Sequence, residues 1–195
     1  MILGITGGTG SGKTTLLEVT KTLGFQVLDC DKIYYELLET DTTLTAAIEA
    51  RFPGTVVEGQ LQRKKLGAVV FADPQALADL NAITHSAVRQ AVEERLRENT
   101  AIDAIALFES GMDRLCDVTV AVTAPQELRV QRLMAREGIT AEYAKSRIAA
   151  QPADSYYQER CDYVLENDGD IIQFQGKCLA FFHRLGIMDE NPKEV

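Results

Sequence analysis

The chain has 195 residues, of which 46% are hydrophobic and 25% are charged, and its formal net charge is −9. This length and composition predict one globular domain with a substantial core. The acidic balance argues against nucleic acid or an anionic membrane as the main partner.

The order of apolar and polar residues also excludes several protein classes. No apolar run approaches the roughly 20 residues that a membrane-spanning helix needs, and the N-terminus has no basic lead or cleavage site. The four cysteines form no C-x-x-C pair, so we expect neither a zinc ribbon nor a redox motif. We therefore expect a cytoplasmic protein with reduced thiols.

The first predicted elements are a short buried strand over 2–5 and a helix over 15–23. Between them, Gly7 to Thr14 match the phosphate-binding pattern G-x-x-x-x-G-K-[ST] without a mismatch. Glycines let consecutive backbone N–H groups turn toward an anion, and the helix N-terminus adds partial positive charge. The motif therefore predicts nucleoside triphosphate binding by Gly8, Thr9, Gly10, Ser11, Gly12, Lys13 and Thr14, the residues that the family resemblance described below assigns to ATP. Lys13 is expected to bridge the β- and γ-phosphates, and the Thr14 hydroxyl to hold Mg²⁺.

Further strands and helices alternate along the rest of the chain. Strands are predicted over 26–29, 102–108, 118–122 and 163–165, and helices over 31–39, 42–52, 63–71, 75–98, 125–136, 140–150 and 170–185. This alternation predicts an α/β fold of the P-loop NTPase type, with three α/β/α layers and a parallel five-stranded sheet. The roughly 70 residues between the second and third strands exceed one crossover. We expect a helical, acceptor-binding insertion at about 31–99 and a lid at about 125–160 within one kinase domain.

Two carboxylates, Asp29 and Asp31, directly follow the second predicted strand. They are expected at the carboxyl edge of the sheet, near the phosphate loop. A carboxylate there can accept a hydroxyl proton or bind Mg²⁺-bound water, which makes Asp31 the preferred catalytic base. Either residue could instead cap the following helix, and this alternative is favoured for Asp29.

Positive charge gathers between residues 129 and 147, where the local balance is +3. Arginine binds phosphate in a forked geometry and neutralises charge that develops during transfer. Arg136 precedes Gly138 at a predicted helix end and hinge, so it is the first candidate for a lid arginine, and Arg147 is the second. Arg129 is expected on a solvated helix face.

Two further residues are candidates for acceptor binding. Glu109 is placed at the end of the third predicted strand, where it suits either a Walker-B-like acid or an acceptor-pocket carboxylate. His85 lies inside the long helix over 75–98, and its position alone favours a packed or capping histidine.

Several segments, in chain order, together resemble the dephospho-CoA kinase family. They are Gly4 to Thr14, Asp29 to Asp31, Val70 to Pro74, Leu80 to His85, Leu107 to Glu109, Arg132 to Gly138, Arg147 to Gln151 and Asp162 to Asn167. The resemblance runs from about residue 2 to about 170, nearly without gaps. Many families share the phosphate loop, but the combination is specific.

The resemblance implies transfer of the ATP γ-phosphate to the ribose 3′-hydroxyl of dephospho-coenzyme A, the last step of coenzyme A synthesis. It implies that Asp31 is the base and Arg136 the lid arginine. It places His85 and Glu109 on the acceptor side, and Arg147 and Asn167 on the ATP side. The expected partners are ATP with Mg²⁺ and dephospho-coenzyme A, but not nucleic acid or membrane. We expect a monomer or a weak homo-oligomer.

The chain departs from the family pattern at several positions. Ile105 and Ser86 stand where the family usually has proline, and Tyr35 stands where it commonly has arginine. In the lid, Gln151 meets Pro152 directly, and the pair Tyr156-Tyr157 replaces an expected positive charge. We therefore expect acceptor binding and part of the phosphate clamp to differ in detail.

Three alternatives remain beside this interpretation. Another small kinase with the same fold, acting on a nucleoside monophosphate or a small hydroxy acid, would differ only in its acceptor pocket. A regulatory GTP-binding switch would need an Asn-Lys-x-Asp and an Asp-x-x-Gly motif, and neither is present. The third alternative is an ATP-binding protein that has lost catalysis, and the altered lid keeps this alternative open.

Overall fold

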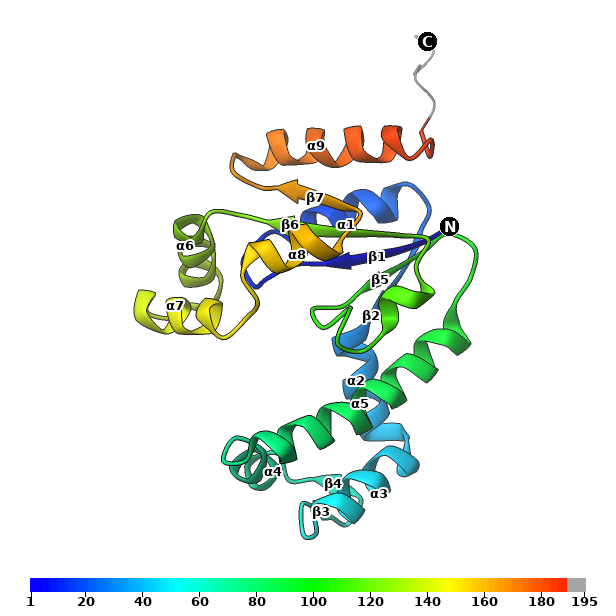
Figure 1. Cartoon of the computed structure of the whole chain (residues 1–195), viewed down its shortest axis with the longest axis vertical. Helices are drawn as coiled ribbons and strands as arrows, with labels where there is room; N and C mark the ends of the chain where they lie inside the picture. The colour runs from blue at the N-terminus through cyan, green and yellow to red at the C-terminus, as the bar shows by residue number, and fades with distance from the viewer. Residues whose placement is uncertain (189–195) are drawn as a thin grey trace.

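The computed structural model describes residues 1–188, and a parallel sheet lies at its centre (Figure 1). Five strands pair in the order β2-β5-β1-β6-β7. They span Ile2–Thr6 (β1), Gln26–Asp29 (β2), Thr100–Asp103 (β5), Val118–Thr123 (β6) and Tyr163–Glu166 (β7). All of these pairings are parallel, which confirms the predicted α/β class and the five-stranded sheet.

The helices lie close to their predicted ranges. They span Lys13–Thr22 (α1), Cys30–Thr40 (α2), Thr42–Arg51 (α3), Arg63–Val70 (α4), Pro74–Arg95 (α5), Gln126–Glu137 (α6), Ala141–Ala149 (α7), Asp154–Arg160 (α8) and Ile171–Arg184 (α9), with a short 3-10 turn over Met112–Leu115 (η1). No helix within residues 1–188 combines the length and hydropathy required to cross a bilayer.

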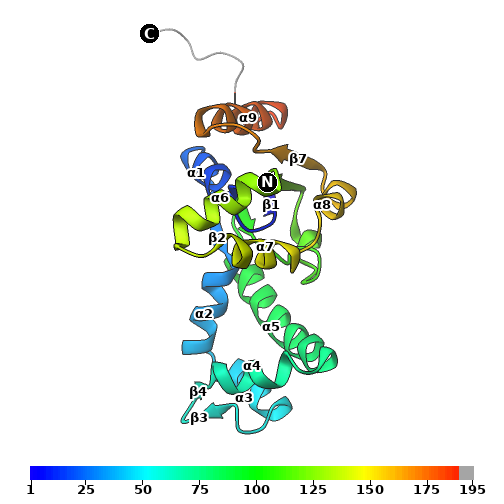
Figure 2. The ribbon, with the colours of Figure 1, turned by 90° about the vertical axis from the view of Figure 1, so that its left-hand side faces the viewer.

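Apolar side chains cover both faces of the sheet. Helices α1 and α9 lie on one side of the sheet (Figure 2). Leu16 of α1 and Phe174, Phe181 and Phe182 of α9 pack with alternate residues of β1 and β6 on this face. On the other face, Val88 and Val92 of α5 pack with Leu28, Ile102 and Leu107. Burial of each such side chain stabilises the fold by about 1.5 to 3 kcal/mol. The two layers hold the sheet rigid, so its carboxyl edge is a fixed platform for functional side chains.

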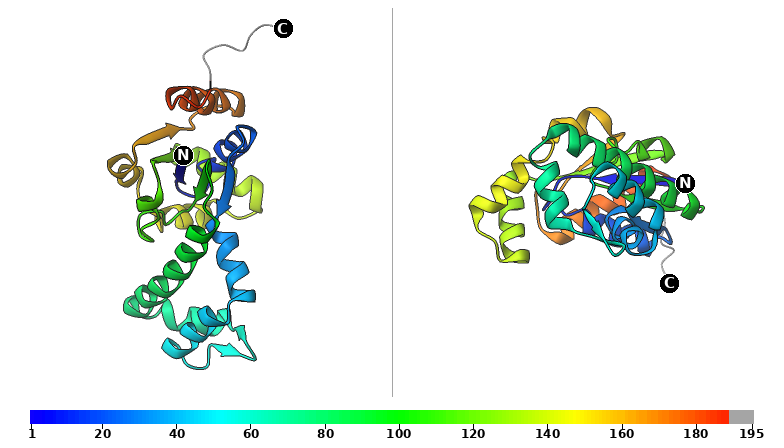
Figure 3. Two further views of the ribbon diagram at one scale, coloured as in Figure 1. Left: turned by 90° about the vertical axis from the view of Figure 1, so that its right-hand side faces the viewer. Right: turned by 90° about the horizontal axis from the view of Figure 1, so that it is seen from below.

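Helices α2 to α5 form an arm that projects from the sheet (Figures 1 and 3). The arm has its own apolar cluster, which includes Leu44, Ile48, Phe52 and Leu66. Its longest helix, α5, begins at Pro74 because the side chain of Asp73 accepts a hydrogen bond from the Gln75 N–H at 2.9 Å. α5 then returns along the arm to the sheet.

The sequence predicted a wholly helical arm, but the arm also contains two short strands. Strands β3 (Val56–Val57) and β4 (Gln60–Leu61) form a small antiparallel hairpin. Its turn contains Glu58 with φ of 51° and Gly59 with φ of 78°. Two-residue strands are too short to show the alternation by which a sequence reveals a strand, so this hairpin was missed.

Helices α6 and α7 form a helical hairpin beside the carboxyl edge of the sheet (Figure 2). Val130 and Leu133 of α6 pack against Ala144 and Ile148 of α7. The turn between the helices contains Gly138, which ends α6 with φ of 66°. Glycine adopts this left-handed conformation without steric cost, so it allows the chain to reverse there.

Near the site, one predicted strand boundary was wrong and one helix was missed. The third strand was expected to run from residue 102 to 108, but β5 ends at Asp103 and turns carry the chain over 105–110. Leu107 is nevertheless fully buried, because it packs into the core from a turn. An apolar run does not by itself distinguish a strand from a buried turn. Helix α8, which has seven residues, was not predicted.

Candidate active site

Residues Gly7 to Thr14, the P loop, connect the end of β1 to the start of α1. Gly7 has φ of 136° and Gly12 has φ of 99°, backbone conformations that other residues rarely adopt. A Cβ at Gly12 would lie 2.1 Å from Asn167 Nδ2, so this position also requires the absence of a side chain. The buried Ser11 Oγ has no hydrogen-bond partner within the described residues. An unpartnered hydroxyl in a glycine-rich turn fits a loop that binds an anion.

Lys13 lies at the start of α1, with its Nζ 3.1 Å from the Gly7 carbonyl oxygen that accepts its hydrogen bond. Burial lowers the pKa of Lys13, while the nearby carboxylates of Asp103 and Asp31 act in the opposite direction. Lys13 therefore lies close to carboxylates that could bind metal-bound water or accept a proton during phosphoryl transfer.

Three carboxylates lie at the carboxyl edge of the sheet beside Lys13. Asp29 ends β2 and accepts the Lys32 N–H at 3.0 Å, so it caps α2, the alternative favoured for it. Asp31 lies in the first turn of the same helix and is exposed. Asp103 ends β5 and was not among the predicted site residues. The sequence concealed it because the apolar run after it extended the predicted strand.

Asp103 has the most perturbed carboxyl group at this edge. Burial raises its pKa to about 6, Lys13 partly opposes this effect, and the charges of Asp29 and Asp31 add to it. A carboxyl group with such an environment, placed beside a P-loop lysine, is typical of functional sites.

A cavity of about 160 Å³ lies among α2, α5 and the turns that follow β5. Asp31 from α2 and His85 from α5 both line it, together with apolar side chains such as Ile105 and Met112. Burial lowers the pKa of the half-buried His85. The structure therefore brings the predicted base and the predicted acceptor-side histidine to one cavity, although they are far apart in sequence.

The sequence predicted that Glu109 ends a strand, but Glu109 lies in the turns that follow β5. It borders a second hollow that also includes His85. The Tyr156 hydroxyl of α8 donates a hydrogen bond to Glu109 Oε1 at 2.6 Å. Burial and this hydrogen bond raise the pKa of Tyr156 to about 12, so the hydroxyl remains a donor. No local sequence pattern predicts this contact.

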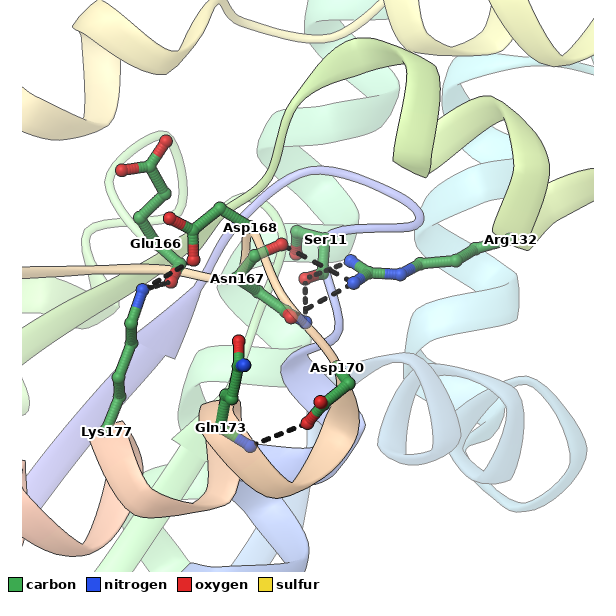
Figure 4. A network of polar contacts seen from close by, with 8 residues as sticks. All are labelled: Ser11, Arg132, Glu166, Asn167, Asp168, Asp170, Gln173 and Lys177. Carbon is green, nitrogen blue, oxygen red and sulfur yellow. Dashed lines mark hydrogen bonds and ion pairs between the residues drawn. The ribbon is translucent and has the colours of Figure 1, made fainter.

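Asn167, which follows β7, supports the P loop from outside (Figure 4). Its Nδ2 donates to the Ser11 carbonyl oxygen at 2.9 Å, and its Oδ1 accepts from Arg132 Nη2 at 3.0 Å. Arg132 also donates to the Gly10 and Ser11 carbonyl oxygens at 3.4 and 3.3 Å. Arg132 was not predicted as a site residue, although its position on the basic stretch was a usable signal.

Arg129 was expected on a solvated helix face, and this expectation was wrong. Its side chain is 5% exposed. Arg129 Nε donates to the Thr9 carbonyl oxygen at 2.9 Å. Helical periodicity indicates which residues share a face, but it does not show that this face of α6 lies against the P loop.

Arg136 and Arg147 lie at the ends of α6 and α7 and are joined through Glu137. Arg136 Nη2 lies 2.6 Å from Glu137 Oε1, while Arg147 Nη1 pairs with Glu137 Oε2. These contacts lower the pKa of Glu137. Both arginines, together with Asp31 and the loop from Gly8 to Thr14, line a hollow of about 330 Å³. The structure thus gathers most of the predicted ATP-site residues around one space.

This arrangement agrees with comparisons to known proteins. The family model for dephospho-CoA kinase matches residues 1–173. Dephospho-CoA kinases from Syntrophotalea carbinolica and Deinococcus radiodurans are 36% and 38% identical, and each match covers 95% of this chain and 92% of the relative.

Solved structures show the same fold. A Thermus thermophilus protein matches with a TM-score of 0.78 and 34% identity, over 95% of this chain and 97% of that one. A Bacteroides thetaiotaomicron shikimate kinase, with a TM-score of 0.62 and 16% identity over 95% and 98% of the two chains, shares the fold. The chain therefore belongs to the dephospho-CoA kinase family, and its function is the ATP-dependent final step of coenzyme A biosynthesis.

Proposed function

We propose that the protein transfers the γ-phosphoryl group of ATP to the ribose 3′-hydroxyl of dephospho-coenzyme A with Asp31 as the general base. The observation that carries this proposal is the position of Asp31, which borders both the P-loop hollow and the cavity that contains His85. A carboxylate between donor and acceptor spaces can orient the attacking hydroxyl and accept its proton.

The triphosphate is proposed to bind along the P loop. Backbone N–H groups of the loop and the N-terminus of α1 provide partial positive charge, except for those of Thr9 and Ser11, which donate to Gln151 Oε1 and to the Gly8 carbonyl oxygen. Lys13 contacts the β- and γ-phosphates, and Arg136 and Arg147 neutralise charge on the transferring group from the opposite side of the hollow. Asn167 contributes by fixing the Ser11 carbonyl rather than by lining that hollow.

Mg²⁺ is proposed to accompany ATP and to neutralise part of its negative charge. No group of three or more His, Cys, Asp or Glu side chains within residues 1–188 is arranged to hold a metal ion. This fits Mg²⁺ in kinases, which is held by one or two protein groups together with phosphates and water. The exposed Thr14 hydroxyl suits this role, since it shares a hollow with Asp29 and Asp103.

The arm is proposed to bind the acceptor within an insertion at about 31–99, and the segment at about 125–160 is proposed to act as a lid. His85 and Glu109 would contact the acceptor, since both border the hollows on the arm side of Asp31. We propose that the protein acts as a monomer or a weak homo-oligomer, with neither nucleic acid nor membrane as a partner.

The direct test is to incubate the purified protein with Mg-ATP and dephospho-coenzyme A and to detect the product by mass. We expect an increase of one phosphoryl group on the acceptor. Nucleoside monophosphates and small hydroxy acids should be tested in parallel. Faster phosphorylation of one of them would contradict the proposed acceptor, and ATP binding without any product would contradict catalysis.

A further inference from the structure

The backbone of Thr9, within the P loop, is held by side chains of the proposed lid segment at both its N–H group and its carbonyl oxygen. The Thr9 N–H donates to Gln151 Oε1 at 2.7 Å. The Thr9 carbonyl oxygen accepts from Arg129 Nε at 2.9 Å. Arg129 Nη2 also donates to Gln151 Oε1 at 3.3 Å, which closes a three-residue network. We call these contacts of Arg129 and Gln151 the Thr9 clamp.

The burial of Arg129 is difficult to explain by stability alone. Placing a guanidinium where only 5% of the side chain is exposed is costly unless its N–H groups find partners. Its carboxylate partner, Asp154, lies 3.6 Å from Nη1 and is 40% exposed, so this pairing is loose. The closest contacts of Arg129 are with Thr9 and Gln151. The planar guanidinium can serve all these partners at once, whereas a lysine ammonium cannot.

Packing against the P loop is equally close. A Cβ at Gly8 would lie 2.2 Å from Arg129 Nη2 and 3.2 Å from Gln151 Oε1. A Cβ at Gly10 would lie 2.9 Å from the Arg129 carbonyl oxygen. The absence of side chains at these two glycines is therefore needed for α6 to approach the loop, and Gly10 also has a φ of 76°, which other residues rarely adopt.

The clamp joins the P loop to both ends of the helical hairpin. Arg129 lies in the first half of α6, and Gln151 lies just after α7. Arg136 and Arg147, which line the phosphate hollow, come from the helix ends between these two positions. The same hairpin thus contacts the loop through Arg129 and Gln151 and presents Arg136 and Arg147 to the hollow.

We propose that Arg129 and Gln151 are positioning residues for phosphoryl transfer: they fix the Thr9 backbone, and with it the neighbouring phosphate-facing N–H groups, relative to the arginines of the α6–α7 hairpin. This inference rests on the proposed ATP site. A small displacement of the groups that hold a reacting phosphate greatly reduces the rate, so a fixed loop-to-hairpin distance has a direct kinetic value.

The first test replaces each clamp residue by methionine, which keeps length and loses the polar contacts. Arg129→Met and Gln151→Met should each raise the KM for ATP by about fivefold to tenfold, the effect of one or two lost hydrogen bonds. The KM for dephospho-coenzyme A should stay within about twofold. Arg129→Lys should give an intermediate KM. Matched controls are Arg114→Met and Gln131→Met, which change exposed side chains of η1 and α6.

The second test disrupts the clamp from the loop side. Gly8→Ala should displace the Arg129 head group and reproduce the ATP effect of Arg129→Met. The double variant Gly8→Ala/Arg129→Met should be no worse than the more impaired single variant, because both changes remove the same contact. Effects on the KM for ATP that multiply in the double variant would overturn the proposal.

The outcomes distinguish this inference from the proposed function. If the wild-type protein does not phosphorylate dephospho-coenzyme A, the proposed function fails. If the wild type is active and the clamp variants change only the unfolding temperature or the active fraction, with an unchanged KM for ATP, Arg129 and Gln151 are structural and the inference is wrong. If Arg129→Met does not fold, the KM for ATP of Gln151→Met decides between the positioning role and the structural role.

Discussion

Asp103 and Asp29 occupy paired positions at the ends of the adjacent parallel strands β5 and β2. Their carboxyl groups leave the sheet at the same edge, beside Lys13 and close to Asp31. Charges of one sign therefore accumulate at this edge, where they add to the effect of burial on the pKa of Asp103.

Asp103→Asn should stabilise the protein and reduce its activity. Burial raises the pKa of Asp103 from 3.8 to about 6, so at neutral pH the folded state holds an unfavourable ionised carboxylate. Removing it should raise the free energy of unfolding at pH 7.5 by about 1 to 3 kcal/mol, from 1.36 kcal/mol per pKa unit. Between pH 4 and 6 the folded state binds more protons than the unfolded state, so wild-type stability falls as pH rises through this range.

The gain from Asp103→Asn should therefore be largest above about pH 6 and should disappear as pH falls toward 4. Urea unfolding at pH 7.5, 6 and 4.5 measures this gain in the free energy of unfolding. Glu159→Gln, at an exposed residue of α8, is the control. A gain that is constant over this range would show that the carboxyl group is not perturbed as described. A stabilised variant with full activity would leave Asp103 without a functional role.

Asp31→Asn should abolish turnover and spare ATP binding, because the amide cannot accept the hydroxyl proton and the P loop remains intact. Calorimetric titration with Mg-ATP gives the affinity, which should stay within about threefold of the wild type, a change of less than 1 kcal/mol. The initial rate of acceptor phosphorylation gives the turnover. A rate equal to that of the wild type would remove Asp31 from the mechanism.

Hydrogen exchange of residues 136–160 should slow when ATP and dephospho-coenzyme A are bound together. Closure of this segment over the hollow would exclude water and prevent wasteful hydrolysis of ATP. Helix α9, on the sheet face covered by α1 and α9, is the internal control and should keep its exchange rates (Figure 2). Unchanged exchange in 136–160 would be evidence against a lid at this place.

Tyr156→Phe should weaken acceptor binding more than ATP binding. The variant loses the hydrogen bond to Glu109, which borders the same hollow as His85. The stability should fall by about 0.5 to 1.5 kcal/mol, as for a typical hydrogen bond, while the KM for dephospho-coenzyme A rises severalfold. Tyr143→Phe, on an exposed tyrosine of α7, is the matched control. Equal changes in both KM values would argue against a specific acceptor-side role.

The sequence predicted the sheet class and the P loop because both depend on local patterns. Gly7 to Thr14 carry their chemistry in consecutive residues, and a strand before and a helix after them place the loop. Asp103 was missed because the buried Leu107 continues an apolar run past the true strand end. Its importance depends on Lys13 and Asp29, which only the folded sheet brings near it.

The basic stretch was harder to interpret because its arginines differ in environment rather than in sequence. Arg129 is buried against Thr9, while Arg136 is 59% exposed and pairs with Glu137. Which face of α6 lies against the loop depends on the crossover from β6. The contact of Tyr156 with Glu109 joins positions 47 residues apart, so no local pattern could reveal it.

The arm carries an apolar cluster of its own, distinct from the two clusters that cover the sheet. Residues such as Ile48 and Phe52 can therefore vary, and loosen or reshape the arm, while the packing behind the ATP machinery is preserved. With the acceptor bound by the arm as proposed, evolution can alter the choice of acceptor in one part of such a molecule and retain the nucleotide chemistry in another.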